Sequence, residues 1–399
     1  MSTLGVVVEY NPFHNGHLHH IQQAKKVTNT DTVVAIMSGS FLQRGEPALI
    51  NKWVRTKMAL TQGVDLIIEL PTVYATQSAD LFAYGSTFLL HHLKVENLVF
   101  GSELGSLEVL NKISDLLLDE PLLLKKYIKD NLSQGYSYPK ALSLALNNFN
   151  NQAEDRIFKP NDILGIQYLY SLKKINSSIR VNTIKRISAN YHDKELNTNN
   201  IASATAIRNS IFTKNQLDEV SSVVPNSTFS LLEEEYAQNR FNSWNNYFQT
   251  LQIIINSQDN KDLLNIHGMV EGLENRIKNN INNAKSFEEF TNLIMTKRYT
   301  LPKIQRTLLY LLLNLTKTKI QSFEIDKGPQ YIRVLGFNEK GKAYLNSIKH
   351  NIELPLITKI TREKSPMLEL DINSSKIYEL GLGNAFAFDE YKRTPVYFK

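Results

Sequence analysis

Short apolar runs alternate with amphipathic stretches over the first hundred residues of the chain. Each run is continuous, which is typical of strands buried on both faces of a parallel sheet that helices cover on both sides. The pattern predicts strands at 6–8, 32–37, 65–70 and 96–100, with helices at 16–27, 51–62 and 77–92. We therefore predict an α/β fold with a doubly wound, Rossmann-like parallel sheet. Ligands of such sheets bind at the carboxyl ends of the strands.

The pattern changes along the rest of the chain. Helices are predicted at 106–150, at 160–173 and from 201 to 211, and a strand at 181–187. Beyond about residue 220, long helical stretches dominate, and only 328–336 and 354–360 suggest short strands or turns. We therefore predict a catalytic α/β domain over residues 1–220 and a mostly helical region over residues 221–399.

Composition excludes several classes of protein. The chain contains no cysteine, which removes disulfides, thiolate zinc sites and cysteine nucleophiles. No basic leader precedes the first predicted strand. The longest apolar run, 308–313, is far shorter than the roughly 18 residues that a membrane span needs. We expect a soluble, cytoplasmic protein with no membrane association, and nothing in the sequence implies a protein partner.

Positive charge is concentrated in one segment. The formal net charge is +6, but residues 297–364 hold 14 Lys and Arg against 5 Asp and Glu, a balance of +9. Such a segment is typical of proteins that bind a polyanion, and nucleic acid is the usual one. An ordinary solvated surface explains the composition equally well.

The segment 9–21, EYNPFHNGHLHHI, places two histidines at the first predicted strand-to-helix turn. Gly16 lets a ligand approach the backbone, and the free N–H groups of a helix N-terminus, with Asn15 as the predicted N-cap, attract phosphate. His14 and His17 could then donate hydrogen bonds to phosphoryl oxygens, where negative charge develops. A metal site is less favoured, because no carboxylate follows in a ligand-like spacing and HExxH is absent. A surface histidine cluster is the remaining alternative.

The stretch from Val7 to His17, VVEYNPFHNGH, resembles the HxGH signature of the nucleotidylyl-transferase superfamily. A second signature of that superfamily, ISSTxIR, is similar to residues 202–208, ASATAIR, where Ser203, Thr205 and Arg208 match. Four further stretches make the chain similar to one family, the bacterial tRNA(Met) cytidine acetate ligases: 38–47 (SGSFLQRGEP), 68–80 (IELPTVYATQSAD), 100–103 (FGSE) and 185–193 (KRISANYHD).

The resemblance implies a two-step reaction. Acetate and ATP would give acetyl-adenylate and pyrophosphate, and the N4 amine of the wobble cytidine in elongator tRNA(Met) would then attack the acetyl group. The products would be N4-acetylcytidine and AMP. Mg²⁺ would accompany the ATP phosphates, with no dedicated metal site in the protein.

The resemblance also implies roles for residues. His14 and His17 would be catalytic, as electrostatic stabilisers of the phosphates. The ATP-binding residues would be Val7, Val8, Glu9, Tyr10, Asn11, Pro12, Phe13, His14, Asn15, Gly16, His17, Leu18, His19, His20, Gly101, Asn161, Arg186, Ile187, Thr205 and Arg208. Asn161 could equally be a helix N-cap. Acetate or cytidine would lie near Ser40, Gln43 and Arg44, although Arg44 could equally be a structural ion-pair residue. The tRNA would contact Lys297, Arg298, Lys303 and Arg306.

Two other functions compete with this one. A small-molecule adenylyltransferase would use the same HxGH chemistry, but it would have no use for a basic C-terminal region. A non-catalytic tRNA-binding protein would keep the fold and bind tRNA without exchanging pyrophosphate.

Overall fold

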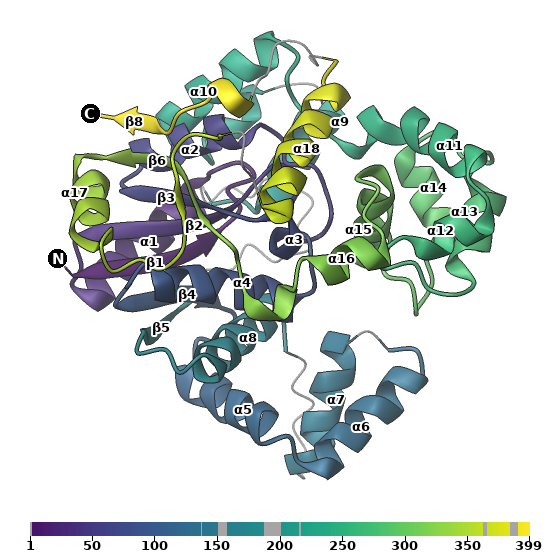
Figure 1. Cartoon of the computed structure of the whole chain (residues 1–399), viewed down its shortest axis with the longest axis horizontal. Coiled ribbons are helices and arrows are strands. Elements are labelled where there is room, and N and C mark those ends of the chain that lie inside the picture. Colours follow the sequence, from purple (N-terminus) through teal and green to yellow (C-terminus); the bar gives the residue numbers. More distant parts are fainter. Residues whose placement is uncertain are drawn as a thin grey trace.

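An eight-stranded sheet forms the centre of the part of the chain that the computed structural model describes, namely residues 2–136, 138–150, 158–186, 201–214, 217–361, 365–383 and 390–399 (Figure 1). The strand order is β5-β4-β1-β2-β3-β6-β7, and β8 pairs with β6. The strands are β1 (Thr3–Val8), β2 (Thr32–Ser38), β3 (Leu66–Leu70), β4 (Asn97–Ser102), β5 (Arg180–Lys185), β6 (Ile332–Asn338), β7 (Leu356–Ile357) and β8 (Val396–Phe398).

The first five strands confirm the predicted doubly wound α/β sheet. β1 pairs in parallel with both β2 and β4, and β5 pairs in parallel with β4. The chain therefore runs from β1 outward to β3 on one side and from β4 to β5 on the other. The point where this direction reverses lies between β1 and β4, and in open α/β sheets ligands bind at the carboxyl ends of the strands there.

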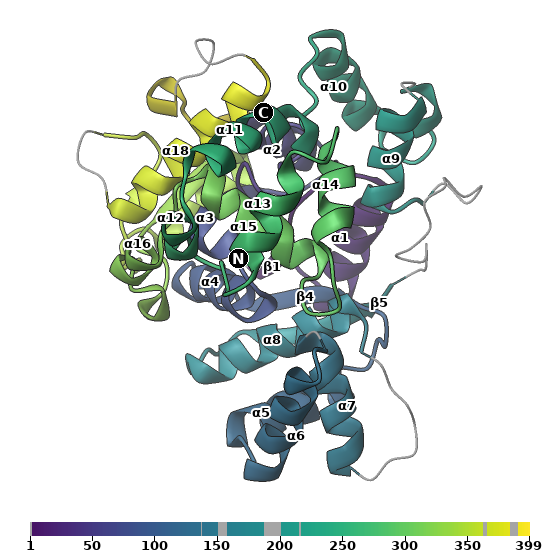
Figure 2. The same cartoon turned by 90° about the vertical axis from the view of Figure 1, so that its right-hand side faces the viewer.

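Helices cover both faces of the sheet (Figure 1). Those of the first 220 residues are α1 (Asn15–Thr28), α2 (Lys52–Thr61), α3 (Thr72–Ala75), α4 (Ala79–His92), α5 (Leu107–Asp119), α6 (Leu122–Ser133), α7 (Tyr138–Asn150), α8 (Pro160–Lys174), α9 (Ala204–Lys214) and the 3-10 turn η1 (Asp218–Val220). α6 and α7 pack together beneath α8 and beside α5, away from the sheet, in both views (Figure 1, Figure 2).

The segment after residue 220 is mainly helical, as predicted. Its elements are α10 (Asn226–Ala237), η2 (Trp244–Tyr247), α11 (Phe248–Ser257), α12 (Asn260–Asn265), α13 (Leu273–Ile281), α14 (Phe287–Ile294), α15 (Leu301–Leu312), α16 (Lys317–Ser322), η3 (Ile325–Lys327), α17 (Glu339–Ile348), α18 (Pro366–Gly381) and η4 (Glu390–Lys392). α11 to α14 form a group to one side of the sheet, with α15 between this group and the sheet (Figure 1). None of the described helices is long and apolar enough to cross a membrane.

Strands from beyond residue 220 complete the sheet. β6 runs antiparallel to β3, with Glu69 opposite Arg333, and β8 runs parallel to β6. The predicted domain boundary near residue 220 remains a prediction, but the sheet itself draws on both sides of it.

A buried ion cluster holds this addition in place; it consists of Lys52, Glu69, Arg333 and Glu390. The Lys52 ammonium lies 2.7 Å from Glu69 and 3.1 Å from Glu390, and Arg333 pairs with the same two carboxylates. The four side chains are at most 3% exposed. Buried charges are costly unless they are paired. Lys52 and Glu69 of the N-terminal part therefore depend on Arg333 and Glu390 remaining in position, and the reverse also holds.

Candidate active site

His14 and His17 stack at the start of α1. Their ring centroids are 3.7 Å apart, and each Nδ1 accepts a backbone hydrogen bond: His14 from Gly16 N at 3.0 Å and His17 from His14 N at 3.2 Å. This reciprocal pattern is a capping box, so His14 is the N-cap and the prediction of Asn15 was wrong. Asn15 instead donates its side-chain amide to the Ser222 carbonyl at 3.2 Å. A Cβ at Gly16 would lie 2.9 Å from the His14 ring, which explains the glycine.

The caps fix the protonation of both rings. Because each Nδ1 accepts a hydrogen bond, the proton of the neutral imidazole is on Nε2, which remains a donor. Burial, with the charges of Arg186 and Arg208, lowers the pKa of His14 to about 3. Burial and the neighbouring His14 hold the pKa of His17 well below its usual range. The site therefore presents two neutral N–H donors at neutral pH.

Two aromatic rings pack against His17 of the histidine pair. The ring centroid of His17 lies 5.0 Å from that of Tyr10 and 5.6 Å from that of Phe13, and both aromatic rings are buried. Between them, Asn11 accepts a hydrogen bond from Leu49 N at 2.7 Å and precedes a cis proline peptide bond. The turn after β1 is thus stabilised by the packing of its own aromatic rings and by the hydrogen bond of Asn11 with Leu49, which lies in the loop between β2 and α2.

The carboxyl ends of β4 and β5 form the other wall. Gly101 lies in β4 next to Arg186, which directly follows β5: a Cβ at Gly101 would be 3.2 Å from the Arg186 side chain. The Arg186 charge lowers the pKa of His14, His17 and His20, so the guanidinium lies on the histidine side of the sheet. Asn161 donates to the Glu103 carboxylate at 2.6 Å. Ile187 lies outside the described residues.

The N-cap of α8 is Lys159, with Pro160 in the first turn, so Asn161 is not the cap. Its side-chain amide instead donates to the carboxylate of Glu103, the residue that follows β4. Asn161 therefore belongs to the wall formed by the carboxyl end of β4.

α9 contributes Arg208 from the second motif. Its guanidinium donates to the Asn11 carbonyl at 2.9 Å and pairs with Glu46 at 3.3 Å. Ser203, in contrast, accepts a hydrogen bond from Ala206 N at 3.1 Å, so its hydroxyl caps the helix. Thr205 is half-buried, whereas Ala202 and Ala206 are buried in the core. The motif thus combines a helix start with one guanidinium directed at the histidine turn.

The loop between β2 and α2 brings Gln43 and Arg44 to the end of β1. Gln43 N donates to the Glu9 carboxylate at 2.8 Å, and Arg44 lies close enough to Glu9, Glu46 and Arg208 for their charges to act on its pKa. Ser40 lies elsewhere: it is buried, and its hydroxyl is 3.3 Å from that of Ser375, which contacts Lys52 of the ion cluster. Its place beside the acetate remains a prediction.

The four predicted tRNA contacts are divided between two environments. Lys297 and Arg298 are exposed. Arg306 is half-buried, and its Nη1 donates to the Gln43 carbonyl at 3.2 Å. Lys303 lies 5.5 Å from the centroid of the Tyr299 ring. A Cβ at Gly45, where φ is +83°, would collide with the backbone of Arg306. The N-terminal half of α15 therefore packs directly on the loop that contacts Glu9.

Arg55 is a residue of the site that sequence reasoning missed. It is fully buried and donates to the carbonyls of Glu9 at 2.7 Å, Ser38 at 3.0 Å and Ile50 at 3.1 Å, and also to that of Gly39. It thereby ties the carboxyl ends of β1 and β2 together. Arg55 is one of eight buried residues in the ten-residue helix KWVRTKMALT, and an arginine inside a helix predicted to cover the sheet was the available signal.

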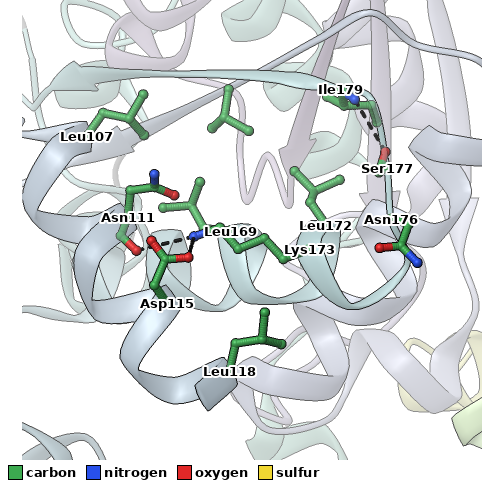
Figure 3. A pocket seen from close by; sticks show the side chains of 11 residues that line it. Leu107, Asn111, Asp115, Leu118, Leu169, Leu172, Lys173, Asn176, Ser177 and Ile179 are labelled. Atoms are coloured by element: carbon green, nitrogen blue, oxygen red, sulfur yellow. Dashed lines mark hydrogen bonds and ion pairs between the residues drawn. The ribbon is translucent and has the colours of Figure 1, made fainter. Parts of the chain in front are cut away.

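A separate cavity of about 670 Å³ lies between α5, α8 and the start of β5 (Figure 3). Lys173 crosses it to reach Asp115 at 2.5 Å and Ser114 at 2.6 Å. No predicted site residue lines this cavity, so it is not part of the site described above.

The fold and the site define a class of enzyme. A histidine pair capping the first helix, at the switch point of a doubly wound sheet, is an arrangement for binding nucleotide phosphates. In agreement, the family model described as HIGH Nucleotidyl Transferase matches residues 1–392.

Comparison with relatives identifies the family to which the chain belongs within this class. The chain is similar to the tRNA(Met) cytidine acetate ligases of Clostridium perfringens strain SM101 (40% identical over 410 residues, 100% of both chains) and Bacillus subtilis strain 168 (41% over 407 residues, 99% of this chain and 97% of the relative). It therefore belongs to the tRNA(Met) cytidine acetate ligase family.

Solved structures agree with this assignment. The chain is similar to crystal structures of Thermotoga maritima TmcAL in its apo form I (TM-score 0.92, 35% identical, 100% of this chain and 99% of that chain) and bound with alpha-thio ATP (TM-score 0.90, 34% identical, the same coverage).

Proposed function

We propose that this protein activates acetate with ATP and transfers the acetyl group to the N4 amine of the wobble cytidine in elongator tRNA(Met). The observation that carries the proposal is the pair of neutral Nε2–H donors at His14 and His17, in a chain whose relatives are named for this ligation. ATP and tRNA are both cytoplasmic substrates, so the proposal includes a cytoplasmic location.

In the first step, an acetate oxygen attacks the α-phosphorus of ATP and the bond to pyrophosphate breaks. No protein nucleophile is needed, so the site contributes position and charge. His14 and His17 donate to phosphoryl oxygens, and the positive charges of Arg186 and Arg208 face the same region. Donors that are already oriented stabilise the negative charge that develops on the leaving pyrophosphate without reorganising.

The walls of the site suggest where the parts of ATP lie. The phosphates would bind along the turn from Val7 to His20, with the Arg208 guanidinium and Thr205 alongside. The adenosine would lie over the ends of β4 and β5, where Gly101 leaves space and Asn161 and Arg186 border it. Acetate would enter from the β2 side, at Gln43 and Arg44.

Mg²⁺ enters the proposal with the nucleotide. In the described residues no group of three or more His, Asp or Glu side chains converges as a metal site. Two of the carboxylates that border the site are engaged by protein side chains, Glu46 by Arg208 and Glu103 by Asn161. The ATP phosphates would therefore supply most of the ligands, and the ion would neutralise their charge.

The tRNA would lie across α15. Lys297, Arg298 and Lys303 would contact phosphates, which position the tRNA without selecting a base. The wobble cytidine must leave its stack to reach the acetyl group. The contact of α15 with the Gln43 loop supports a path from this helix to the acetate side of the site.

The test is transfer of labelled acetate to bulk bacterial tRNA from a strain that lacks the modification, with and without ATP, followed by nucleoside analysis. The expected result is ATP-dependent label in N4-acetylcytidine. Absence of label, with pyrophosphate released on a phosphorylated small molecule instead, would favour an adenylyltransferase. tRNA binding without any pyrophosphate exchange would favour a non-catalytic protein.

A further inference from the structure

Glu9 is the first residue after β1, and it lies where the groups of the site converge. Residue 8 of β1 pairs with Met37 of β2, so Glu9 stands level with the end of β2. Charged or phenolic groups of four other segments lie close enough for their pKa values and that of Glu9 to be linked: Arg44 and Glu46 from the β2–α2 loop, Arg55 from α2, Tyr168 from α8 and Arg208 from α9. Glu9 thus lies between the ends of β4 and β5, where the adenosine is proposed to bind, and Gln43 and Arg44, where acetate is proposed to enter.

The contacts of Glu9 hold it in place and leave one oxygen available. Its backbone carbonyl accepts from Arg55 at 2.7 Å, and its Oε1 accepts from Gln43 N at 2.8 Å. In the part of the chain that the structure describes, no hydrogen bond reaches Oε2. Glu9 is half-buried as a residue, and in the reaction proposed below a substrate reaches this oxygen.

The other acidic groups at the site are occupied. Glu46 pairs with Arg208, Glu103 accepts from Asn161 and from Asp162 N, and Asp162 accepts from Ser102 and from Leu104 N. His14 and His17 carry their protons on the Nε2 atoms that would face the phosphates, so neither can accept another there.

The chemistry of the second step requires a proton acceptor. The lone pair of a cytidine N4 amine is delocalised into the ring, so the amine is a weak nucleophile that must lose a proton as it attacks. On the basis of the proposed function, we propose that Glu9 is the general base of acetyl transfer. The N4 nitrogen bonds to the acetyl carbon, the carbon–oxygen bond to AMP breaks, and the N4 proton passes to Oε2 of Glu9.

The environment of Glu9 suits this task. Burial raises its pKa, with Glu46 acting in the same direction, while Arg44 and Arg208 act against the rise. A carboxylate with a raised pKa accepts a proton more readily than an exposed one. The main competing acceptor is the phosphate of the departing AMP, which needs no protein base.

The experiment separates the two steps with full-length protein. Acetate-dependent exchange of labelled pyrophosphate into ATP, with and without tRNA, reports the first step, and single-turnover transfer of labelled acetyl groups to tRNA reports the second. Glu9→Gln keeps an oxygen for Gln43 N but removes the base. Glu108→Gln, on exposed α5, is the matched control.

We expect Glu9→Gln to slow acetyl transfer about 10²- to 10⁴-fold more than it slows pyrophosphate exchange, as for loss of a general base. The transfer rate of the parent should also rise with pH until Glu9 is ionised, and that dependence should vanish in the variant. Glu108→Gln should match the parent in both steps.

Two results would overturn the inference while leaving the proposed function intact. Normal transfer by Glu9→Gln would assign the proton to the AMP phosphate. Equal losses in exchange and transfer would make Glu9 a structural or ATP-binding residue. Failure of the parent protein to acetylate tRNA would instead count against the proposed function.

Discussion

Arg306, in α15, donates from its Nη1 to the Gln43 carbonyl at 3.2 Å across 263 residues of sequence. Gln43 N in turn donates to the Glu9 carboxylate. Arg306, which was predicted to contact tRNA, is therefore linked to the end of β1 by two hydrogen bonds through Gln43. Helix α15 is part of the wall of the site as well as a candidate tRNA-binding surface.

Replacing Arg306 with Ala should impair acetate activation even without tRNA. The Gln43 loop would lose a charge-assisted hydrogen bond worth about 1.5 kcal/mol or more, so we expect at least about tenfold slower pyrophosphate exchange. Lys297→Ala, on an exposed neighbour, should leave exchange unchanged. If Arg306→Ala altered only the affinity for tRNA, the loop interaction would have no catalytic consequence.

The exposed charges before α15 should act through salt-dependent binding. The double variant Lys297→Gln/Arg298→Gln should weaken tRNA binding and reduce the slope of log K against log salt by about 0.7 to 0.9 for each phosphate that the protein no longer neutralises. Filter binding over a range of salt concentrations measures this slope. Lys112→Gln, at an exposed position on α5, is the control. An unchanged slope would place the tRNA elsewhere.

His14→Ala and His17→Ala should each abolish most acetate activation. Loss of one preorganised donor to developing charge typically lowers the rate by about 10²- to 10³-fold. The affinity for tRNA should remain the same, because neither ring is among the proposed phosphate contacts Lys297, Arg298 and Lys303. His350→Ala, at an exposed residue, is the control for both measurements. Exchange that survived both substitutions would remove the histidines from the phosphate site.

Acid should destabilise the protein through His14. The unfolded chain binds a proton at this ring near pH 6.5, whereas the folded protein does so only at about 3, so lowering the pH between these values favours unfolding. From pH 7 to pH 5 the loss is about 2 kcal/mol of unfolding free energy for this ring. His14→Asn keeps an N-cap side chain and should lack that part of the pH dependence in urea titrations. Equal dependence in both proteins would mean that the folded site protonates easily.

Ser203 should matter to stability more than to ATP binding. Ser203→Ala removes the cap of α9 and should lower the unfolding free energy by about 1 kcal/mol. Ser203→Asp should restore it, with the KM for ATP unchanged in both variants. A hydroxyl in contact with phosphate would give the opposite pattern, because a carboxylate there would repel ATP and raise the KM.

The N-terminal strands and helices could be predicted because they are local patterns. Continuous apolar runs such as that of β2, whose seven residues are all buried, indicate a strand covered on both faces. The partner of β3 could not be predicted in this way. The choice of β6 depends on pairing across more than 250 residues and on Arg333 meeting Glu69, which no spacing reveals.

The residues of the site also divide into those that a local sequence pattern predicts and those that only the tertiary fold brings together. The HxGH spacing predicted a phosphate-binding turn, and His14 and His17 do meet there. The capping role of His14 was missed, because imidazole is an unusual N-cap and Asn15 is a better one by composition. Arg208 was predicted from its motif, but its partners Asn11 and Glu46 come from loops whose proximity only the tertiary fold creates.

The ion cluster has a consequence for the order of biosynthesis. Lys52 and Glu69 leave the ribosome early, whereas Arg333 and Glu390 emerge near the end of synthesis. Until then, the open edge of β3 lacks β6, and within the ion cluster Lys52 and Glu69 have only each other as partners. The nascent chain can therefore form the histidine turn long before it can close the sheet, and a version ending near residue 220 should need a chaperone or aggregate through that edge.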